Sequence, residues 1–502
     1  MTQTWKRVAT VSIAAVMLAG SLAGCGGKNA AKIDRDNPTI RVMTKQFQAE
    51  SADSNSPVMQ ELENYLGTKL EMTWAPNANY DEKVTATMGS GNYPHVMLVG
   101  KRSSSIIQAS RKNRFWDITD KIKDAEKFPN LAQANETVNH NISIDGKVYG
   151  LYRARTIGRA GVSIRKDWLE KLNMEIPTTI DEFYNVLKAF KEQDPDGNGQ
   201  ADTYGMILTN YIDGPLNNLA IWMGAPNEYG VQDGKLVSKY MYDEYLDALK
   251  FLRKCKEEGL INTNFATYDS NKWNEEFLTG KAGVIIDVAD RARRLAQNME
   301  DQTVVDVFGY VKKDANTEPR TLPTTGYDGY YVFPKAAIAN EEDLDFVLGV
   351  MDKANDQEAL NLMNFGIKGR SYEIDEEGYV VKKDEPDITR EYADLNQFAT
   401  GIVATELKTR YTAPVAEKID AVYEENENYA VANPAEPYVS ETYSTSGPQL
   451  DAIMAAANTK FINGDISEDE WKAERDRWLQ QGGQKVVDEL NEAYAADPSK
   501  IQ

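Results

Sequence analysis

The sequence predicts an α/β protein with two lobes and a helical C-terminal region. Strand-like and helix-like segments alternate between residues 39 and 100, and the alternation starts again near residue 160. After residue 450 the chain carries helical patterns only. Alternating strands and helices favour a largely parallel sheet covered by helices, and a chain of 502 residues is long enough for two such units.

The first run reads strand, helix, strand, helix, strand. Strands are expected at 39–47, 71–76 and 95–100, and helices at 56–70 and 80–94. Sheets of this kind bind their ligands at the carboxyl ends of the strands. We therefore expect ligand-binding loops at 44–56 and 100–105.

The second run contains two amphipathic helices. Apolar residues recur at helical spacing over 180–192 and 242–257, and Cys255 falls on the apolar face of the latter, where burial is expected. A further strand is expected at 330–334. Capping boxes are expected at Thr179 with Glu182 and at Ser467 with Glu470. Packing roles are expected for Trp168, Trp471 and Trp478.

The two lobes are expected to be discontinuous in sequence. The chain would cross between them at hinge crossovers near 150–155, 286–290 and 328–334. On this division the first lobe holds 38–152 and 289–329, and the second lobe holds 153–288 and 330–502.

The N-terminus has the pattern of a lipoprotein signal. A short basic region and an apolar stretch from Val8 to Gly20 lead to Leu-Ala-Gly, which directly precedes Cys25. This arrangement matches the bacterial lipobox, whose cysteine becomes lipidated. The alternative is a transmembrane anchor with a chance cysteine, but the apolar stretch is short for a span. We expect a signal peptide at 1–24, and a lipidated Cys25 with a flexible tether over 25–37.

Composition excludes several function classes. The formal net charge is −22, and removing residues 1–24 takes away Lys6 and Arg7 but no acidic residue, which leaves −24. Nucleic acid and anionic lipid headgroups are poor partners for such a chain. The only histidines are His95 and His140, and no phosphate loop, nucleophile elbow or Cys/His metal spacing occurs. The sequence therefore predicts no catalytic residues.

The stretch Asp194–Gly205, DPDGNGQADTYG, has the spacing of a calcium loop. Its oxygen donors are Asp194, Asp196, Asn198, the main chain at Gln200, and Asp202. Glycine at the sixth position allows the tight turn, and hard oxygen donors favour Ca²⁺. The twelfth position is Gly205 where a bidentate glutamate is expected. The alternative is an Asx-rich turn without an ion. We expect a structural Ca²⁺ that braces a helix-to-strand connection.

Several segments resemble one known family. They are GKVYGLYR (146–153), the long stretch 164–206 that includes the calcium loop, FLTGKAGVIID (277–287), NFGIKGRSYEI (364–374), and FINGDISEDEWKAERDRWLQQGGQKVVDELNEAY (461–494). Together they resemble the bacterial extracellular solute-binding lipoproteins of carbohydrate ABC importers, in particular the long subgroup for oligosaccharide or uronate-oligosaccharide uptake.

The resemblance implies a periplasmic-binding-protein-like fold whose two lobes close on a ligand by a hinge motion. It further implies an oligosaccharide ligand, a permease made of separate polypeptides, a monomer, and calcium on the five donors named above. Two positions depart from the family's pattern. Thr203 stands where members commonly have glutamate, and His95 stands where relatives usually have aspartate.

A saccharide offers apolar C–H faces to aromatic rings and a rim of hydroxyls to polar side chains. Candidates come from polar loops at expected strand ends and crossovers, with Arg155 beside them and Arg370 suggested by the resemblance. The expected ligand-binding residues are Gln46, Phe47, Trp74, Lys101, Arg102, Arg153, Tyr211, Asp213, Asn217, Trp222, Asp287, Asp290, Arg291, Tyr327, Asp328, Tyr330 and Arg370.

Two other function classes stay open from the sequence. A membrane-anchored carbohydrate-active enzyme would need two carboxylates about 5–10 Å apart across a cleft, and no spacing in the chain indicates such a pair. A peptide-binding receptor of the same fold is the other, because one fold hosts many ligands.

Overall fold

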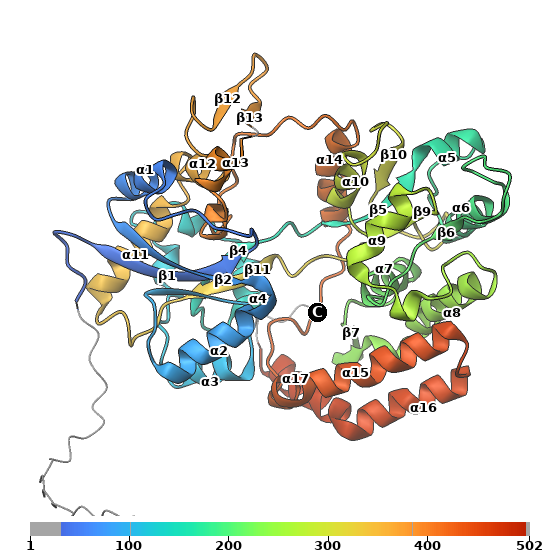
Figure 1. The fold of residues 1–502 in the computed structure, drawn as a ribbon. Helices are drawn as coiled ribbons and strands as arrows, with labels where there is room; N and C mark the ends of the chain where they lie inside the picture. The colour runs from blue at the N-terminus through green and yellow to red at the C-terminus, as the bar shows by residue number, and fades with distance from the viewer. Residues whose placement is uncertain (1–31, 101, 384, 498–502) are drawn as a thin grey trace, which may run out of the picture.

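The computed structural model describes residues 32–100, 102–383 and 385–497, which form two lobes side by side (Figure 1). The predicted signal peptide 1–24 and Cys25 lie outside the described residues. Of the predicted tether, residues 32–37 are described, and part of this segment packs on the first lobe. Ile33 is buried, and Arg35 Nη2 lies 2.9 Å from Asp343 Oδ1. The end of the expected flexible tether is therefore fixed to the protein body.

The first lobe contains a five-stranded sheet. Its strands are β1 (Thr39–Gln46), β2 (Lys69–Pro76), β3 (Val96–Val99), β4 (Gly150–Ala154) and β11 (Tyr327–Val332). The order is β2-β1-β3-β11-β4, with β1 parallel to β2 and β3, and β11 antiparallel to both of its neighbours. The predicted strand–helix alternation over the first hundred residues is confirmed, and β11 is the one strand that runs against the rest.

Helices cover this sheet on both faces (Figure 1). They are α1 (Pro57–Leu66), α2 (Tyr80–Ser90), α3 (Ser104–Arg111), α4 (Glu136–Ile142), α11 (Glu341–Lys353), α12 (Gln357–Phe365) and α13 (Pro386–Arg390). A small hairpin of β12 (Tyr372–Ile374) and β13 (Val380–Lys382) projects from the lobe. The core holds the apolar residues of the strands, such as Val42, Leu98 and Val332, all of them fully buried.

The second lobe contains a four-stranded sheet and a separate hairpin. The sheet has the order β10-β5-β9-β6, and the strands are β5 (Ala160–Arg165), β6 (Tyr204–Met206), β9 (Ala282–Val288) and β10 (Val305–Phe308). The hairpin joins β7 (Tyr229–Gln232) to β8 (Lys235–Ser238). The helices are α5 (Lys166–Lys171), α6 (Ile180–Glu192), α7 (Asp213–Met223), α8 (Asp243–Glu257), α9 (Trp273–Leu278), α10 (Asp290–Ala296) and α14 (Ala416–Asn428), followed by the C-terminal helices.

The C-terminal region is helical, as predicted. It consists of α15 (Glu441–Asn463), α16 (Glu468–Trp478) and α17 (Gln484–Ala496), which pack on α8 and β8 and share the core of the second lobe. The capping box of Ser467 and Glu470 is confirmed. The one at Thr179 is incomplete, because the Glu182 carboxylate accepts the N–H of Thr178 instead. Cys255 is fully buried, as expected.

The division of the chain between lobes differs from the prediction. The expected crossover at 286–290 does not exist, because β9 is a central strand of the second sheet and α10 and β10 continue in the same lobe. Residues 289–308 therefore belong to the second lobe. In turn β11 pairs with β3 and β4, which places 327–332 in the first lobe together with α11 to α13. The misplacement of 289–308 and that of 327–332 have the same cause. A strand-like run of sequence does not indicate which sheet the strand will join.

Three segments connect the lobes, and the first two of them are hydrogen-bonded to each other. The N–H of Arg155 donates to Gly326 O at 3.0 Å, and the N–H of Thr324 donates to Ile157 O at 2.9 Å. The third segment leaves the first lobe only beyond residue 409, because the N–H of Val380 on β13 still donates to Lys408 O at 2.8 Å. The first predicted crossover, near 150–155, is confirmed. Because these two connections run side by side, a small rotation of both segments changes the angle between the lobes.

Candidate functional site

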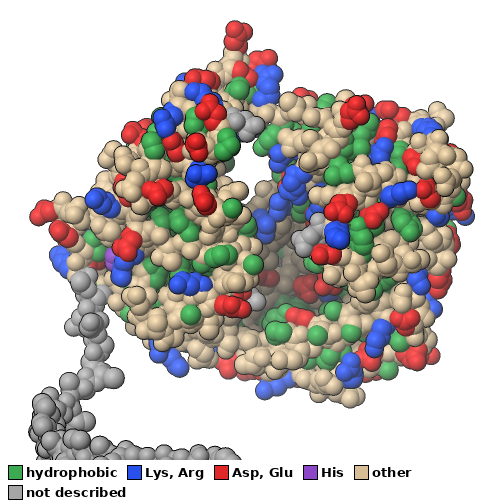
Figure 2. Space-filling view, viewed as in Figure 1, with side chains coloured by type: hydrophobic (Ala, Val, Ile, Leu, Met, Phe, Trp, Pro, Cys, Tyr) green, Lys and Arg blue, Asp and Glu red, His purple; other side chains and the backbone are tan. Residues whose placement is uncertain are grey.

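A hollow lies between the two lobes, and Figure 2 shows basic side chains on its walls. Within it the structure forms a pocket of about 350 Å³, here called the interlobe pocket. The first lobe contributes Arg102, Ile107 and Tyr327; the second contributes Glu228, Tyr229, Ser238, Tyr240, Tyr443, Ser444, Asp451, Trp478, Val486 and Leu490; and the segment between them contributes Asn433, Ala435, Glu436, Tyr438, Val439 and Ser440. Both lobes thus contact whatever occupies this space.

Aromatic rings form much of the wall of the interlobe pocket. Tyr443 is 48% exposed, an unusual exposure for a large ring, and it presents its face beside Tyr229. Trp478 packs edge to face on Tyr240, with ring centroids 5.3 Å apart, so both rings are held in fixed orientations. Rigid, partly wet rings are suited to stack on the apolar face of a sugar.

Lys239 joins the polar groups at the floor of this pocket. Its ammonium lies 2.6 Å from Glu228 Oε1 and 3.0 Å from Asn217 Oδ1, and its side chain is almost fully buried. Glu228 has a φ of +58°, a region that residues other than glycine seldom occupy. The surrounding structure therefore holds the backbone of Glu228 in a strained conformation. This fixes the position of its carboxylate at the pocket.

Arg102 ties the first lobe to the segment that follows α14. Its Nη1 donates to Pro437 O at 2.9 Å and to Ser143 O at 3.2 Å, and its Nη2 donates to the carbonyl of Glu436. The Glu436 carboxylate also accepts the Tyr327 hydroxyl at 3.2 Å. Burial raises the pKa of Glu436, and the nearby Arg102 only partly opposes this. Both predicted residues here, Arg102 and Tyr327, contact the pocket.

Three cations surround one carboxylate beside the interlobe pocket, and we call this group the cation cluster. Asp328 lies 3.4 Å from Lys45 Nζ, 3.9 Å from Arg153 Nη1 and 4.0 Å from Arg155 Nη1. Burial raises the pKa of Asp328, but the fields of Lys45, Arg155 and Arg153 together hold it below its ordinary value.

The cation cluster stands at the edge of the first sheet where ligands were expected. Lys45 and Arg153 are the last residues but one of β1 and β4, and Asp328 is the second residue of the antiparallel β11. The pairing of β11 with β4 shifts register just after Tyr327, and Gly329 has a φ of +84°. A Cβ on Gly329 would lie 2.6 Å from the carbonyl oxygen of Val99, so this bulge requires glycine. Bulges re-aim side chains next to binding sites.

Several predicted residues gather on the second lobe, around the start of α7 and the end of β9. Arg291 lies above the Trp273 ring at 4.7 Å and pairs with Asp287, while Tyr211, half-exposed, packs edge to face on the same ring. At the start of α7, burial raises the pKa of Asp213. Asp290 is paired with Arg159 and Arg294 and accepts the hydroxyl of Tyr423.

Two predicted ligand residues lie in the core instead. Trp222 is 2% exposed and packs edge to face on Phe183 in the second lobe. Tyr330 is 1% exposed and points into the first sheet's core. Both had been chosen because they follow strand-like or polar segments. The helix α7 and the strand β11, however, turn these two side chains inward.

Other predicted residues lie apart from the interlobe pocket. Trp74 lines a different cavity, together with residues 51–55. Phe47, half-exposed, lines a third one in the first lobe, next to Gln46 in sequence. Arg370 pairs with Glu391 near the β12–β13 hairpin. Lys101 lies outside the described residues.

Of the residues that line the pocket, sequence reasoning predicted only Arg102 and Tyr327; the aromatic and acidic ones that it missed include Glu228, Tyr229, Tyr240, Glu436, Tyr443, Asp451 and Trp478. Trp478 was expected to be a packing residue, and it does pack on Tyr240, but one side of it also lines the pocket. The usable signal was a cluster of aromatic and acidic residues around 228–240 and around 436–443, where α15 begins.

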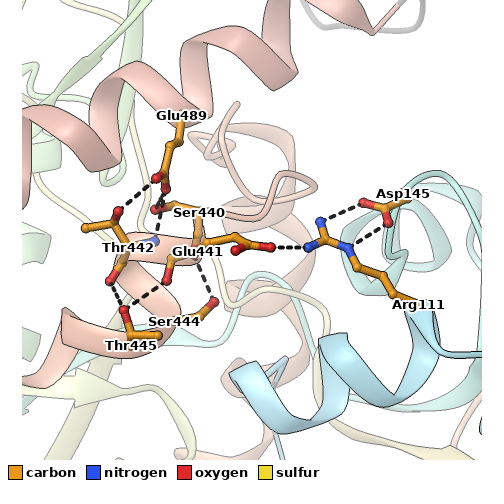
Figure 3. A network of polar contacts seen from close by, with 8 residues as sticks. All are labelled: Arg111, Asp145, Ser440, Glu441, Thr442, Ser444, Thr445 and Glu489. Carbon is orange, nitrogen blue, oxygen red and sulfur yellow. Dashed lines mark hydrogen bonds and ion pairs between the residues drawn. The ribbon is translucent and has the colours of Figure 1, made fainter.

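An ion pair spans the lobes near the pocket (Figure 3). Arg111, at the end of α3, lies between Asp145 of its own lobe and Glu441, the first residue of α15. The start of α15 is itself fixed, because Glu489 on α17 accepts the hydroxyls of Ser440 and Thr442 at 2.6 and 2.8 Å. Arg111 therefore bonds to a rigid part of the second lobe.

The predicted calcium loop forms a compact turn between α6 and β6. Its oxygen atoms already have protein partners. The Asp194 carboxylate accepts the N–H of Gly199 at 3.0 Å, Lys281 Nζ lies 2.6 Å from Asp202 Oδ2, and Lys171 Nζ donates to the Asp194 carbonyl at 3.1 Å. Nowhere in the described residues do three or more acidic, histidine or cysteine side chains form a group that could hold a metal. The oxygen donors suit calcium, but the ammonium of Lys281 competes for one of them, the Asp202 carboxylate.

Two α/β lobes joined by three segments, with a polar and aromatic pocket between them, define a protein that encloses a ligand. Residues 58–368 match the family model of the bacterial extracellular solute-binding proteins. The chain is 38% identical to lipoprotein LipO of Bacillus subtilis over 97% of its length and 98% of that protein. It is 31% identical to the polygalacturonan/rhamnogalacturonan-binding protein YtcQ of the same bacterium, over 98% of its length and 99% of that protein. The chain therefore belongs to the family of bacterial extracellular solute-binding proteins.

A solved structure supports the fold. An HMO-binding, ABC-transporter-associated solute-binding protein of Bifidobacterium longum infantis superposes with a TM-score of 0.70 and 20% identity, covering 91% of this chain and 98% of that one. The predicted two-lobed fold is thereby confirmed. Among the described residues, no helix combines the length and the apolar character that a membrane crossing requires.

Proposed function

We propose that this protein captures an oligosaccharide in the interlobe pocket and delivers it to an ABC importer without changing it chemically. The observation that carries the proposal is a pocket shared by both lobes, with aromatic rings such as Tyr229 and Tyr443 beside polar groups such as Arg102 and Glu228. Rings and hydrogen-bonding groups in one pocket are what a saccharide requires. The binding of a polysaccharide by the relative YtcQ supports it.

Capture would work through the hinge. A ligand that contacts Arg102 and Tyr327 on one lobe and Tyr443 on the other binds better when the lobes are close together, so it shifts the population toward the closed arrangement. The permease subunits, expected to be separate polypeptides, would then recognise the closed form. Such a receptor works as a monomer held by a lipid at Cys25 on the outer face of the cell membrane.

A structural calcium ion in the loop is also part of the proposal. Asp194, Asp196, Asn198, the Gln200 carbonyl and Asp202 would hold it, and Lys281 would have to leave Asp202. A site weakened in this way would bind at roughly 10⁻⁴–10⁻³ M, which is sufficient outside the cell. Replacing Lys281 by Met should therefore tighten calcium binding. Calcium titration followed by thermal stability measures this, and an unchanged or weaker affinity in K281M would remove the ion from the proposal.

The main test is calorimetric titration of the chain from residue 26 with neutral oligosaccharides, acidic oligosaccharides and short peptides. Binding of one saccharide class, with unaltered ligand recovered afterwards, is the expected result. Cleavage of the saccharide would favour the alternative of a carbohydrate-active enzyme. Binding of peptides alone would favour the alternative of a peptide receptor.

A further inference from the structure

We propose that the cation cluster of Lys45, Arg153 and Arg155 binds a carboxylate on the ligand, so that the oligosaccharide this protein selects is acidic. The inference rests on the proposed function and names its substrate class. Its basis is the charge, burial, hydrogen bonding and position of the cluster at the edge of the first sheet.

The cluster has more positive than negative charge. In the part of the chain that the structure describes, Asp328 is the one carboxylate paired with Lys45, Arg153 or Arg155. Three cations and one anion leave two positive charges without a counterpart. Other arginines near the hollow have carboxylates at short distance. Arg291, for example, lies 2.5 Å from Asp287.

Two of the three cations are largely removed from water, whereas the side chain of Arg155 is 42% exposed. The side chains of Lys45 and Arg153 are only 12% and 14% exposed. Burying a charge without a partner is costly, whereas on an exposed surface water would solvate it. A protein that is strongly acidic overall gains no solubility from this arrangement. A ligand anion would supply the missing partner.

The geometry leaves the cations weakly paired within the cluster, and Arg155, 42% exposed, is the one that a ligand can reach directly. The three distances to Asp328, between 3.4 and 4.0 Å, are long for charged hydrogen bonds, and Arg153 Nη1 is buried without a hydrogen-bond partner. Arg155 is the more exposed of the two arginines. A guanidinium whose donors are free can bind a carboxylate through two parallel hydrogen bonds, which a hydroxyl cannot reproduce.

The position of the cluster fits a ligand that also occupies the interlobe pocket. Asp328 directly follows Tyr327, whose ring lines that pocket. The cluster also adjoins the segment that leaves β4 for the second lobe, where Arg155 bonds to Gly326 through its N–H. One sugar ring could thus stack in the pocket while its neighbour in the chain places a carboxylate at the cluster.

The test compares trigalacturonate with the neutral trisaccharide of galactose by calorimetric titration. The protein and two variants are used, Arg155→Gln and the double variant Lys45→Gln with Arg155→Gln. We expect the acidic ligand to bind the protein at least tenfold more tightly than the neutral one. The double variant should lose at least tenfold in affinity for the acidic ligand and less than twofold for the neutral one. Lys408→Gln, at an exposed ion pair elsewhere, should change neither affinity.

Asp328→Asn provides a second, opposite test. Removing the competing carboxylate should tighten binding of trigalacturonate several-fold and leave the neutral ligand unchanged. Equal affinities for both ligands, or equal losses in the double variant, would show that the cluster is structural, with the proposed receptor function intact. If neither saccharide binds any of these proteins, the proposed function itself fails and the inference fails with it.

Discussion

The interlobe pocket and the cation cluster are neighbours along β11, yet they offer a ligand different contacts. The pocket has rings on several sides and carries both signs of charge, as in the pair of Glu228 and Lys239. The cluster has no aromatic side chain among its four members and an excess of positive charge. Tyr327 belongs to the first region and Asp328 to the second.

Because of this difference, the pocket would contribute affinity for saccharides in general, and the cluster would select among them. Stacking on a ring depends on the apolar face that all common sugars share, so the pocket accepts many saccharides. A buried cation without a partner discriminates strongly, because a neutral ligand leaves it unpaired. The two regions together would hold sugars in general and choose among them by charge.

The largest expected effect comes from removing two rings of the pocket. The double variant Tyr229→Ala with Tyr443→Ala should weaken acidic and neutral trisaccharides alike, each by about 10–100-fold, since each ring interaction contributes about 0.5–1.5 kcal/mol. Titration calorimetry measures both affinities. Tyr379→Ala, on the projecting hairpin, serves as the control and should change neither. A loss confined to the acidic ligand would show that the two regions are not separate.

Ionic strength should distinguish the same two regions without any mutation. Raising the salt concentration from about 0.02 to 0.5 M shortens the Debye length several-fold, and so it should weaken binding of the acidic ligand about three- to tenfold. Binding of the neutral ligand should stay constant, because stacking and neutral hydrogen bonds are not screened. Equal weakening of the two ligands would argue against charge selection at the cation cluster.

The sequence predicted the cluster better than the pocket, and there is a physical reason. Arg153, Arg155 and Asp328 were predicted beside crossovers, and Lys45 only as part of the expected loop 44–56. The carboxyl ends of β1 and β4 and the start of the antiparallel β11 lie at one edge of the sheet, so local patterns suffice to bring these residues together. Tyr229 and Tyr443 come from a hairpin and a helix more than 200 residues apart. Only tertiary packing of α15 and α17 on the second lobe brings them together, and no local pattern encodes it.

The errors in the core have a related origin. Trp222 and Tyr330 were correctly placed near polar loops, but the direction of a side chain depends on which face its element buries. In α7 the buried face includes Trp222, and in β11 the bulge at Gly329 sets which residues point inward. A bulge shifts the alternation of a strand by one residue, so periodicity alone misassigns the side chains beyond it.

The pH dependence of stability should have opposite signs in the two regions. Lys45, Arg155 and Arg153 outweigh burial and lower the pKa of Asp328, so its stabilisation is complete above the ordinary pKa near 4 and is lost as the pH falls through the lowered value. Burial raises the pKa of Glu436, so stability is lost as the pH rises through the raised value.

Two variants measure this difference as melting temperatures between pH 3 and 8. Asp328→Asn should be less stable than the parent by a constant few degrees from pH 5 to 8, and the deficit should shrink at lower pH. The melting temperature of Glu436→Gln should rise relative to that of the parent as the pH increases from 4 to 8. Parallel profiles for the two variants would contradict the assigned pKa directions.

The smallest expected effect concerns the ion pair that joins the lobes. Arg111→Ala removes the contact with Glu441, and its carboxylate partners are more than half exposed, so the loss should be within about 0.2–1 kcal/mol. Because the contact favours the arrangement of lobes seen here, the variant should release its ligand about two- to fivefold faster, as stopped-flow tryptophan fluorescence would show. Arg253→Ala, which removes an ion pair with Glu257 and a hydrogen bond to Ile466 O, both inside the second lobe, is the control and should release the ligand at the parent's rate. The change should be the same for acidic and neutral ligands, since Arg111 lies outside both the pocket and the cluster. An effect limited to the acidic ligand would instead mean that Arg111 contributes to charge selection.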